Sequence, residues 1–519
     1  MSNPGATQGF PGACEGAVRW GLVALIAFTP LAFGTVERWS IAVMEWGIIT
    51  LLLIALMGHC WQPASTRPRF HRATGLELPA VLFMGLCVLQ TVPLPLHWLA
   101  AVAPGSARLY AAPDLRQVAA EQWPDLEVPD GDRLLEPASE TRRPISLRPD
   151  LTWERIRLLA AFVSLFVLTG AWARTMDRIV FLLGAITLVG CLVGAQALVQ
   201  YLTWNGRIYW VRKVPPSSAF GPFVNHNHFA GYVEMIIPVA IALSFHLFAL
   251  RRHRAAPSPA GFVARGWLVE DDDSRIGPNL GALTLFGAIL LLVTLFFSLS
   301  RGGILSTLAS GGVLLALVWR RSKGYPVRWV ATLGVPIVAA SLILWIGVGP
   351  IQQRFGELEE PSNEASLQSR VVVWRAVLDE LPEFAWVGAG LGSFEHSFAR
   401  FTPAGSASRW DKAHNDYLQV AWETGAVGAG LAFLGALVFA RRYWFPAARS
   451  KARGLDILRI GVAASILSMA LHSVIDFNLQ IGSNGFLFVV LCALLVSLSR
   501  LPDGEPVPVR TMVEPGRPR

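Results

Sequence analysis

The chain has 519 residues and a net charge of +8; 53% of its residues are hydrophobic and only 15% are charged. A soluble protein carries about a quarter charged residues, so this composition argues against an ordinary soluble fold. The apolar runs of about 20 residues can each cross a hydrocarbon core of ~30 Å, and they lack the alternation of a transmembrane β-barrel. We therefore expect an all-α polytopic membrane protein. In such a protein the placement of Lys and Arg matters more than their sum, so nucleic-acid binding is not expected.

The cysteines indicate neither a disulfide framework nor a metal site. None makes a CxxC or similar spacing, and most lie in apolar runs, where Cys acts as a small hydrophobic residue. The five are Cys14, Cys60, Cys87, Cys191 and Cys492. The first 16 residues lack the basic segment of a cleaved signal peptide, so we expect the first span to stay as an uncleaved anchor.

About twelve transmembrane helices are expected, in a single membrane domain over 1–519. Their cores are expected at 17–35, 40–58, 76–92, 151–173, 179–202, 227–250, 280–299, 302–319, 327–349, 416–440, 457–475 and 481–499. Two polar stretches, 93–150 and 350–415, are expected to be long external loops. The end of the chain, 500–519, is expected to be a cytoplasmic tail without ordered structure.

The short basic loops fix the orientation. If the N-terminus is cytoplasmic, all of them fall on the cytoplasmic side, as the positive-inside rule requires. Their residues are Arg67, Arg69, Arg72, Arg174, Arg178, Arg251, Arg252, Arg254, Arg320, Arg321, Lys323, Arg441, Arg442, Arg449, Lys451 and Arg453. Both termini are then cytoplasmic. The stretch 201–225, Arg301, Arg370 and His414 converge on the external side, although none of them was used to set the orientation.

The stretch 201–225 carries a basic–aromatic patch and leads into a polar helix entry. The patch consists of Arg207, Tyr209, Trp210, Arg212 and Lys213. It fits an interfacial anchor, with sugar stacking or contact to a lipid phosphate as the alternative. Asn225 is expected to cap the next helix or to bond substrate hydroxyls, with Asn227 in support. His226 and His228 have no carboxylate or thiolate near them in sequence, so a metal site is not expected.

Two arginines are candidate phosphate ligands. Arg301 lies between two apolar runs and is followed by two glycines. Arg370 precedes Trp374 by four residues, so the two share a face if this segment is a helix. A guanidinium is always charged, and its forked donors suit phosphate oxygens. The alternatives are a short external hairpin with a solvated Arg301 and an amphipathic surface helix carrying Arg370.

The segment 413–425 places polar side chains at the mouth of an apolar span, where each costs free energy unless it is wet or paired. His414 is the candidate here that changes charge near neutral pH without a large pKa shift. Asn415, Asp416 and Glu423 are candidates to support it, although Asp416 could equally be a helix-start carboxylate favoured by the macrodipole. Further polar residues near the external end of the last hairpin either complete the site or line a wet crevice; they are His472, Asp476, Asn478 and Gln480.

Taken together, these motifs resemble the O-antigen ligase and O-antigen (exopolysaccharide) polymerase family of bacterial inner-membrane glycosyltransferases. The resemblance is carried by FVNHN at 223–227, SRG at 300–302, SRVVVW at 369–374, GAGLG at 388–392 and HNDYLQ at 414–419. These motifs define a core at 220–425. Their order, spacing and common side carry the resemblance, because no single motif is specific.

The resemblance implies a fold like that of C-type glycosyltransferases, with the loop 350–415 as a large periplasmic loop over the active site. It also implies transfer of a glycan from undecaprenyl diphosphate to an acceptor hydroxyl, with inversion and without a metal or cofactor. Arg301 and Arg370 match the two arginines expected to hold the diphosphate, and His414 matches the expected base. Besides the donor, the acceptor glycan or lipid and the bilayer, a chain-length regulator and a flippase are possible partners.

Two further questions stay open from the sequence. A polymerase of exopolysaccharide repeat units is favoured over a ligase to lipid A–core, because 93–150 with its VPLP segment looks more like such polymerases; transfer to a protein hydroxyl is a third option. A transporter is the alternative from another class. The spans are nearly free of charge and show no evident inverted repeat, which disfavours transport.

Overall fold

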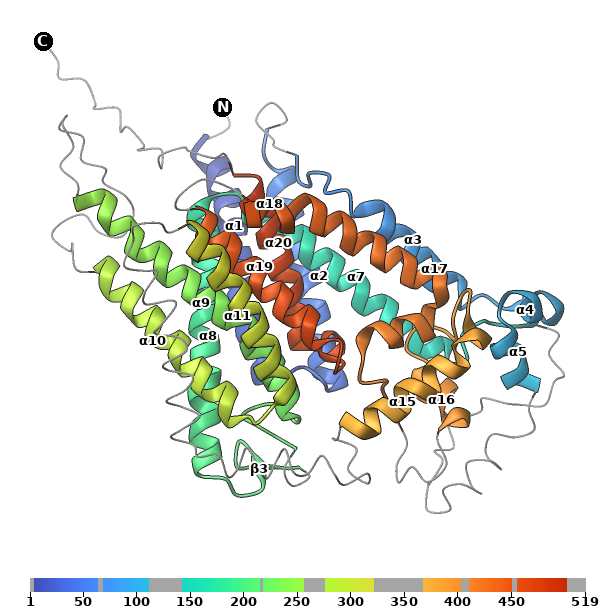
Figure 1. Ribbon diagram of the computed structural model, residues 1–519. Coiled ribbons are helices and arrows are strands. Elements are labelled where there is room, and N and C mark those ends of the chain that lie inside the picture. Colours follow the sequence, from blue (N-terminus) through green and yellow to red (C-terminus); the bar gives the residue numbers. More distant parts are fainter. Residues whose placement is uncertain are drawn as a thin grey trace, which may run out of the picture.

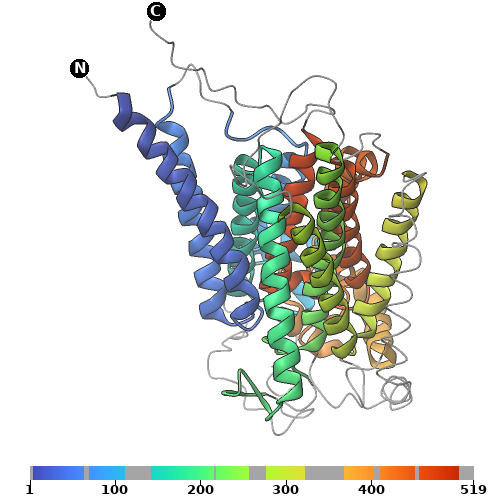
Figure 2. The same cartoon turned by 90° about the vertical axis from the view of Figure 1, so that its left-hand side faces the viewer.

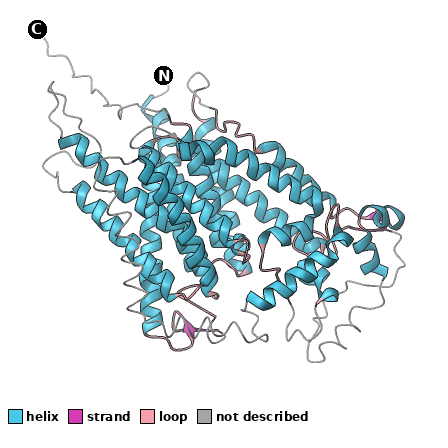
Figure 3. Cartoon of the chain, viewed as in Figure 1, coloured by secondary structure: helices cyan, strands magenta, loops and turns pink. Residues whose placement is uncertain are grey.

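The protein is described by a computed structural model that covers residues 4–63, 69–111, 142–214, 218–255, 276–321, 367–402, 410–449 and 455–501. Long helices dominate these residues (Figure 3). They are α1 (Pro4–Leu31), α2 (Arg38–Cys60), α3 (Glu77–Leu89), α7 (Pro149–Trp172), α8 (Met176–Leu202), α9 (His226–Ala255), α10 (Ile276–Phe297), α11 (Arg301–Arg321), α17 (Asp416–Phe439), α19 (Leu455–His472) and α20 (Gly482–Ser499).

Shorter elements lie between the long helices. The helices are α4 (Leu96–Val102), α5 (Pro104–Ala111), α15 (Leu367–Glu380), α16 (Phe394–Phe398) and α18 (Phe445–Arg449). The strands form two antiparallel pairs, β1 (Leu94–Pro95) with β2 (Arg142–Arg143) and β3 (Arg207–Ile208) with β4 (Arg212–Lys213). Helical turns occur at Leu381–Phe384, Ala399–Phe401, Ala440–Trp444 and Asn478–Gln480.

The long helices form one bundle around α9 and α20 (Figure 1). In their most apolar windows, 83% of the α9 residues and 78% of the α20 residues are buried, against 28% in α2 and 22% in α17. The apolar residues of α2 and α17 therefore face outward, as they would toward lipid. One large hydrophobic core joins α1, α2, α7, α8, α9, α10, α19 and α20.

The bundle has two chemically distinct ends. We call the end where α7 and α20 begin, near Pro149 and Gly482, the site end. The opposite end, where α7 and α20 finish near Trp172 and Ser499, is the basic end. The described chain begins and ends at the basic end, with the start of α1 and the end of α20, whereas α15 and α16 lie at the site end (Figure 1 and Figure 2).

The helices confirm the expected all-α architecture with several membrane spans. Eight described helices are long and apolar enough to cross a membrane, and α3 and the first part of α11 are apolar but shorter. Eleven of the twelve predicted cores coincide with long helices; the core at 327–349 lies outside the described residues. The count of twelve therefore stays a prediction, as do the compartments that the two ends face.

Some predicted boundaries were wrong. The first span was expected to run to residue 35, but α1 ends at Leu31, and Phe33 and Thr35 adopt positive φ angles of 56° in the turn that follows. Such a turn cannot continue a helix. The stretch 93–150 holds short helices and strands up to Ala111 and from Arg142, and 350–415 holds α15 and α16. The remainder of both stretches, and the tail from 502, lies outside the described residues.

Candidate functional site

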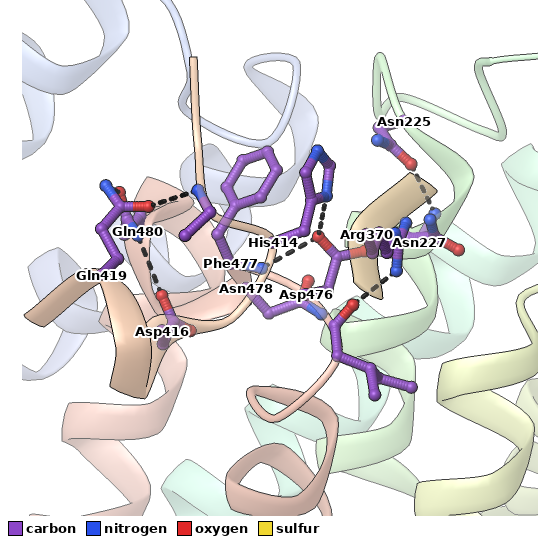
Figure 4. Close-up of polar contacts among 12 residues, drawn as sticks. Asn225, Asn227, Arg370, His414, Asp416, Gln419, Asp476, Phe477, Asn478 and Gln480 are labelled. Atoms are coloured by element: carbon purple, nitrogen blue, oxygen red, sulfur yellow. Dashed lines mark hydrogen bonds and ion pairs between the residues drawn. The ribbon is translucent and has the colours of Figure 1, made fainter. Parts of the chain in front are cut away.

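At the site end, one buried carboxylate joins two of the predicted site residues. The His414 Nδ1 lies 3.3 Å from Asp476 Oδ1, and the Arg370 Nη2 lies 3.6 Å from Asp476 Oδ2 (Figure 4). Arg370 also donates a hydrogen bond to the carbonyl oxygen of Ile475. Asp476 is fully buried and Arg370 is 8% exposed. An imidazole and a guanidinium from distant parts of the chain therefore share a single anion.

Three separate elements bring these side chains together. Arg370 lies on α15, His414 precedes α17, and Asp476 lies in the connection between α19 and α20. The Trp374 indole donates to the Ala413 carbonyl (2.9 Å), which ties α15 to the residue before His414. The segment with Arg370 and Trp374 is a helix, so the two side chains lie four residues apart on α15.

The backbone at His414 is held in an uncommon conformation. Its φ angle is +48°, in the left-handed region that non-glycine residues seldom adopt. Asn415 then begins α17 by accepting hydrogen bonds from the backbone N–H groups of Tyr417 and Leu418, both at 3.0 Å. The His414 ring meets Phe477 edge-on, with ring centroids 4.9 Å apart, and lies 5.7 Å from the Trp410 ring. Aromatic contacts and a helix cap therefore fix the direction of the imidazole.

The charge on Asp476 is maintained by its neighbours. Burial alone would raise the pKa of this carboxyl, but Arg370 and the hydrogen bond to His414 outweigh burial and hold the pKa well below its usual range. Asp476 is therefore an anion at neutral pH. The hydrogen bond to His414 Nδ1 assigns the proton of a neutral ring to Nδ1, which leaves the lone pair on Nε2.

Asp416 holds the segment that carries Asp476 instead of contacting His414. Its carboxylate accepts from Leu479 N (3.1 Å) and Gln480 Nε2 (3.0 Å), and its own N–H donates to the Ser473 carbonyl (2.9 Å). Figure 4 shows the Asp416–Gln480 contact apart from the His414–Asp476 pair. Asp416 thus contacts the connection between α19 and α20, and its supporting role stays a prediction.

Arg301 is the first residue of α11, and its neighbour Gly302 lies against the same connection. A Cβ on Gly302 would come within 2.7 Å of His472 Nε2 and 2.8 Å of Ile475 Cδ1. The His472 carbonyl in turn accepts the backbone N–H of Asp476 (3.1 Å). The start of α11 therefore packs directly on the turn that presents Asp476.

The other predicted supporting residues have local partners. Glu423 accepts from the N–H groups of Gly392 (2.8 Å) and Phe394 (3.3 Å), and so holds the glycine-rich segment at 388–392. Arg212 pairs with Glu37 (2.5 Å) and lies over the Phe33 ring, at the turn between α1 and α2. These contacts favour a structural role for both.

Asn225 behaves as a helix cap. Its Oδ1 accepts the N–H of Asn227 (2.8 Å), and its carbonyl oxygen accepts the N–H groups of His228 and Phe229 at the start of α9. The His228 ring meets Phe477 edge-on at 4.9 Å. Within the described ranges, no group of three or more His, Cys, Asp or Glu side chains is placed to hold a metal ion.

Two connections were missed by sequence reasoning. Gln90, at the end of α3, donates to the carbonyls of Val387 (2.7 Å) and Glu423 (2.8 Å) and accepts the Leu391 N–H (3.0 Å). Glu234 lies about two turns inside α9, where it is fully buried 3.1 Å from His472 Nδ1. The sequence signals for these contacts were a Gln directly after an apolar run, Gln90, and a Glu within one, Glu234.

The region that carries Arg301, Arg370 and His414 matches a known family. Residues 286–434 match the family model described as O-antigen ligase. This part of the chain is an O-antigen ligase domain. The matched residues include Arg301, Arg370 and His414, whereas Asn225 and Asp476 lie outside them. Among the curated proteins, none matches the chain.

The match at 286–434 confirms the resemblance seen in the sequence. It indicates an enzyme of the glycosyltransferase type with glycan transfer of the O-antigen ligase kind, and the apolar helices indicate a multi-pass membrane protein.

Proposed function

We propose that the protein transfers a glycan from undecaprenyl diphosphate to a sugar hydroxyl, and that it polymerises polysaccharide repeat units at the periplasmic face of the inner membrane. The observation that carries this proposal is the buried Asp476 between His414 and Arg370. It combines an oriented base with a fixed cation, which are the two groups that displacement of a diphosphate requires.

His414 is the proposed base. With its Nδ1 proton directed to Asp476, Nε2 is free to accept the proton of the acceptor hydroxyl as the oxygen attacks the anomeric carbon. The new C–O bond forms as the bond to the diphosphate breaks, and the electron pair leaves with the diphosphate. Attack from the opposite side inverts the anomeric centre. A positioned base of this kind contributes roughly 10²- to 10⁴-fold to the rate.

Arg370 and Arg301 are the proposed ligands of the leaving diphosphate. The buried Nε of Arg370 has no hydrogen-bond partner among the described residues, so a donor is available for a phosphate oxygen. Arg301 begins α11, where the helix dipole adds further positive potential. Cations fixed before the reaction stabilise charge that develops in the transition state, and here they take the place of a divalent metal.

Polymerisation is favoured by the segment before α7. There β1 pairs with β2, and Tyr110 donates to the Ser146 carbonyl (3.0 Å), next to the glycine-rich segment at 388–392. The stretch that resembles polymerases is thus built onto the site end. One alternative is a ligase, which the description of the matching family supports. Transport is the alternative from another class.

The decisive experiment complements a deletion strain with His414→Ala and analyses the glycans. A polymerase should lose long chains and retain single repeat units, because the base is missing. Loss of a ligase would instead leave long lipid-linked glycan that never reaches lipid A–core. His97→Ala is the matched control, since His97 is an exposed histidine on α4. Normal long glycans with His414→Ala would refute the proposed mechanism.

A further inference from the structure

A cavity of about 80 Å³ lies at the basic end, remote from His414. It is bounded by the last turns of α7 and α20 and by residues 70–74 before α3. A single water needs roughly 10–15 Å³ of such volume, so the cavity can hold a group of several heavy atoms.

The polar wall of the cavity is strongly basic. Three of its described lining residues are arginines, namely Arg72, Arg174 and Arg500. No Asp or Glu is among the described lining residues. Arg174 Nη2 donates to the carbonyls of Arg69 (2.7 Å) and Phe70 (2.6 Å). These bonds position the guanidinium without neutralising it, because a carbonyl carries no net charge.

Arg500 is positioned in the same way. Its Nη2 donates to the carbonyls of Arg72 (3.1 Å) and Ala73 (2.7 Å). Burial, Arg72 and Arg178 together lower the pKa of Arg174, which reports crowded positive charge. Each guanidinium has five N–H donors, so both retain donors for an anion.

The opposite wall of the cavity is apolar. Phe166, Gly170 and Ala171 of α7 face Ala493 and Val496 of α20. A Cβ added to Gly170 would meet no atom within 4 Å, so there is open space beside α7 at this residue. A basic pocket that opens onto apolar helix faces at the end of a membrane bundle matches a charged headgroup attached to hydrocarbon chains.

We propose that this cavity binds the phosphate headgroup of an anionic phospholipid, with an acyl chain along α7 at Phe166 and Gly170. The lipid would fasten the segment before α3 to α7 and α20. That segment is also held by Arg442 and Tyr443, which both donate to the Thr74 carbonyl at 2.9 Å. Lipid binding would therefore brace the basic end of α17, whose other end carries His414.

The test is thermal unfolding of the full-length protein in a zwitterionic detergent with added lipid. A ligand that binds only the folded state raises the unfolding temperature in a saturable way. Phosphatidylglycerol should do so, and phosphatidylcholine should not. In Arg174→Gln and Arg500→Gln the apparent affinity should fall about tenfold or more, because each loses a charge-assisted hydrogen bond. Arg19→Gln is the matched control, since Arg19 is exposed on α1 and does not line the cavity.

Lysine variants separate binding from folding. Arg174→Lys and Arg500→Lys keep the charge and should retain part of the phosphatidylglycerol response, even if the Gln variants unfold early. A response to phosphatidylglycerol that is equal in wild type and Gln variants would overturn the proposal. So would saturable stabilisation by inorganic phosphate with none by phosphatidylglycerol, which would make this a free-phosphate site.

Discussion

Asp476 is the residue on which the candidate site depends. It contacts the proposed base through one oxygen and a proposed phosphate ligand through the other. A phosphate group that draws Arg370 toward itself would leave the carboxylate to act on His414 alone. Such a carboxylate favours the imidazolium that forms when the base takes up a proton.

Replacing Asp476 with Asn tests this role at nearly constant volume. An amide can donate to Nδ1 and thereby favour the wrong tautomer of His414, so kcat should fall roughly 10²- to 10⁴-fold. The measurement is transfer by the purified protein with a lipid-linked donor, over a range of donor and acceptor concentrations and pH. A purely structural role would instead lower the amount of folded protein and leave kcat per folded molecule unchanged.

The lowered pKa of Asp476 also determines how the stability of the protein depends on pH. A carboxylate whose folded-state pKa is lowered stabilises the protein above its unfolded pKa of about 4, and this contribution is lost as the pH falls through the folded-state value. Between pH 8 and pH 5 the contribution of the Arg370–Asp476 ion pair to the free energy of unfolding should therefore stay constant. Loss of activity in that range would have to come from a group other than Asp476.

Arg301→Lys tests the proposed phosphate contact. Lysine keeps the charge but lacks the planar fork that matches a diphosphate, so we expect kcat/KM for the donor to fall about tenfold or more. Arg207→Lys, on β3 at the same end of the bundle, is the control. Full activity of Arg301→Lys would favour the alternative of a solvated arginine in a short hairpin.

At the scale of single residues, the sequence predicted which residues share one end of the bundle but not what each side chain contacts. The common side of Arg301, Arg370 and His414 followed from the spacing of apolar runs and basic loops. Asp416 and Glu423 were grouped with His414 because they are close in sequence. On a helix, successive side chains point in different directions, so Asp416 reaches Gln480 and Glu423 reaches Gly392 instead.

Among the elements, the glycine-rich segment at 388–392 is joined to α17 by backbone contacts. Ala389 N donates to the Trp422 carbonyl and Gly390 N to the Glu423 carbonyl, both at 3.0 Å. A Cβ on Gly388 would come within 2.3 Å of the Glu423 backbone, and the φ angle of Gly388 is +74°. Only glycine fits this approach without moving the backbone of α17.

Gly388→Ala should therefore destabilise the protein by about 1–3 kcal/mol and displace α17 at Glu423, which should lower activity. The matched control is Gly430→Ala, within the same α17, where a Cβ meets nothing within 4 Å. That change should be neutral or stabilising by up to about 1 kcal/mol, because alanine favours a helix. Equal unfolding temperatures of the two variants in detergent would contradict the proposed close packing.

Hydropathy predicted the long helices well because each must satisfy its own backbone in lipid. It could not predict α16, which is short and lies at the site end, nor the exact ends of α1 and α3; α15 was suggested by the spacing of Arg370 and Trp374 and not by hydropathy. Helix ends depend on local caps and turns, such as the positive φ angles after Leu31, and these follow from tertiary contacts.

Across the whole molecule, a buried polar cluster joins three helices beneath the site. Glu234 of α9 lies 3.1 Å from His472 of α19 and accepts a hydrogen bond from Ser306 of α11. Glu234 and His472 are 0% and 1% exposed. Because α11 begins at Arg301 and α19 leads into Asp476, this cluster sets the relative positions of a proposed phosphate ligand and the carboxylate that orients the base.

A double-mutant cycle measures this coupling. Glu234→Gln or His472→Gln alone leaves one partner buried without its counterpart, which should cost about 3–5 kcal/mol of stability. The double variant should cost less than the sum, with an interaction energy of about 0.5–3 kcal/mol. Glu234→Gln combined with His97→Gln is the additive control, because His97 is exposed on α4 and has no shared partner.

Unfolding free energies are compared with donor kcat/KM in each variant, since displacement of α11 should raise the KM for the donor. If the Glu234–His472 cycle proves additive, the two helices are positioned by apolar packing alone, and the polar cluster does not couple Arg301 to Asp476.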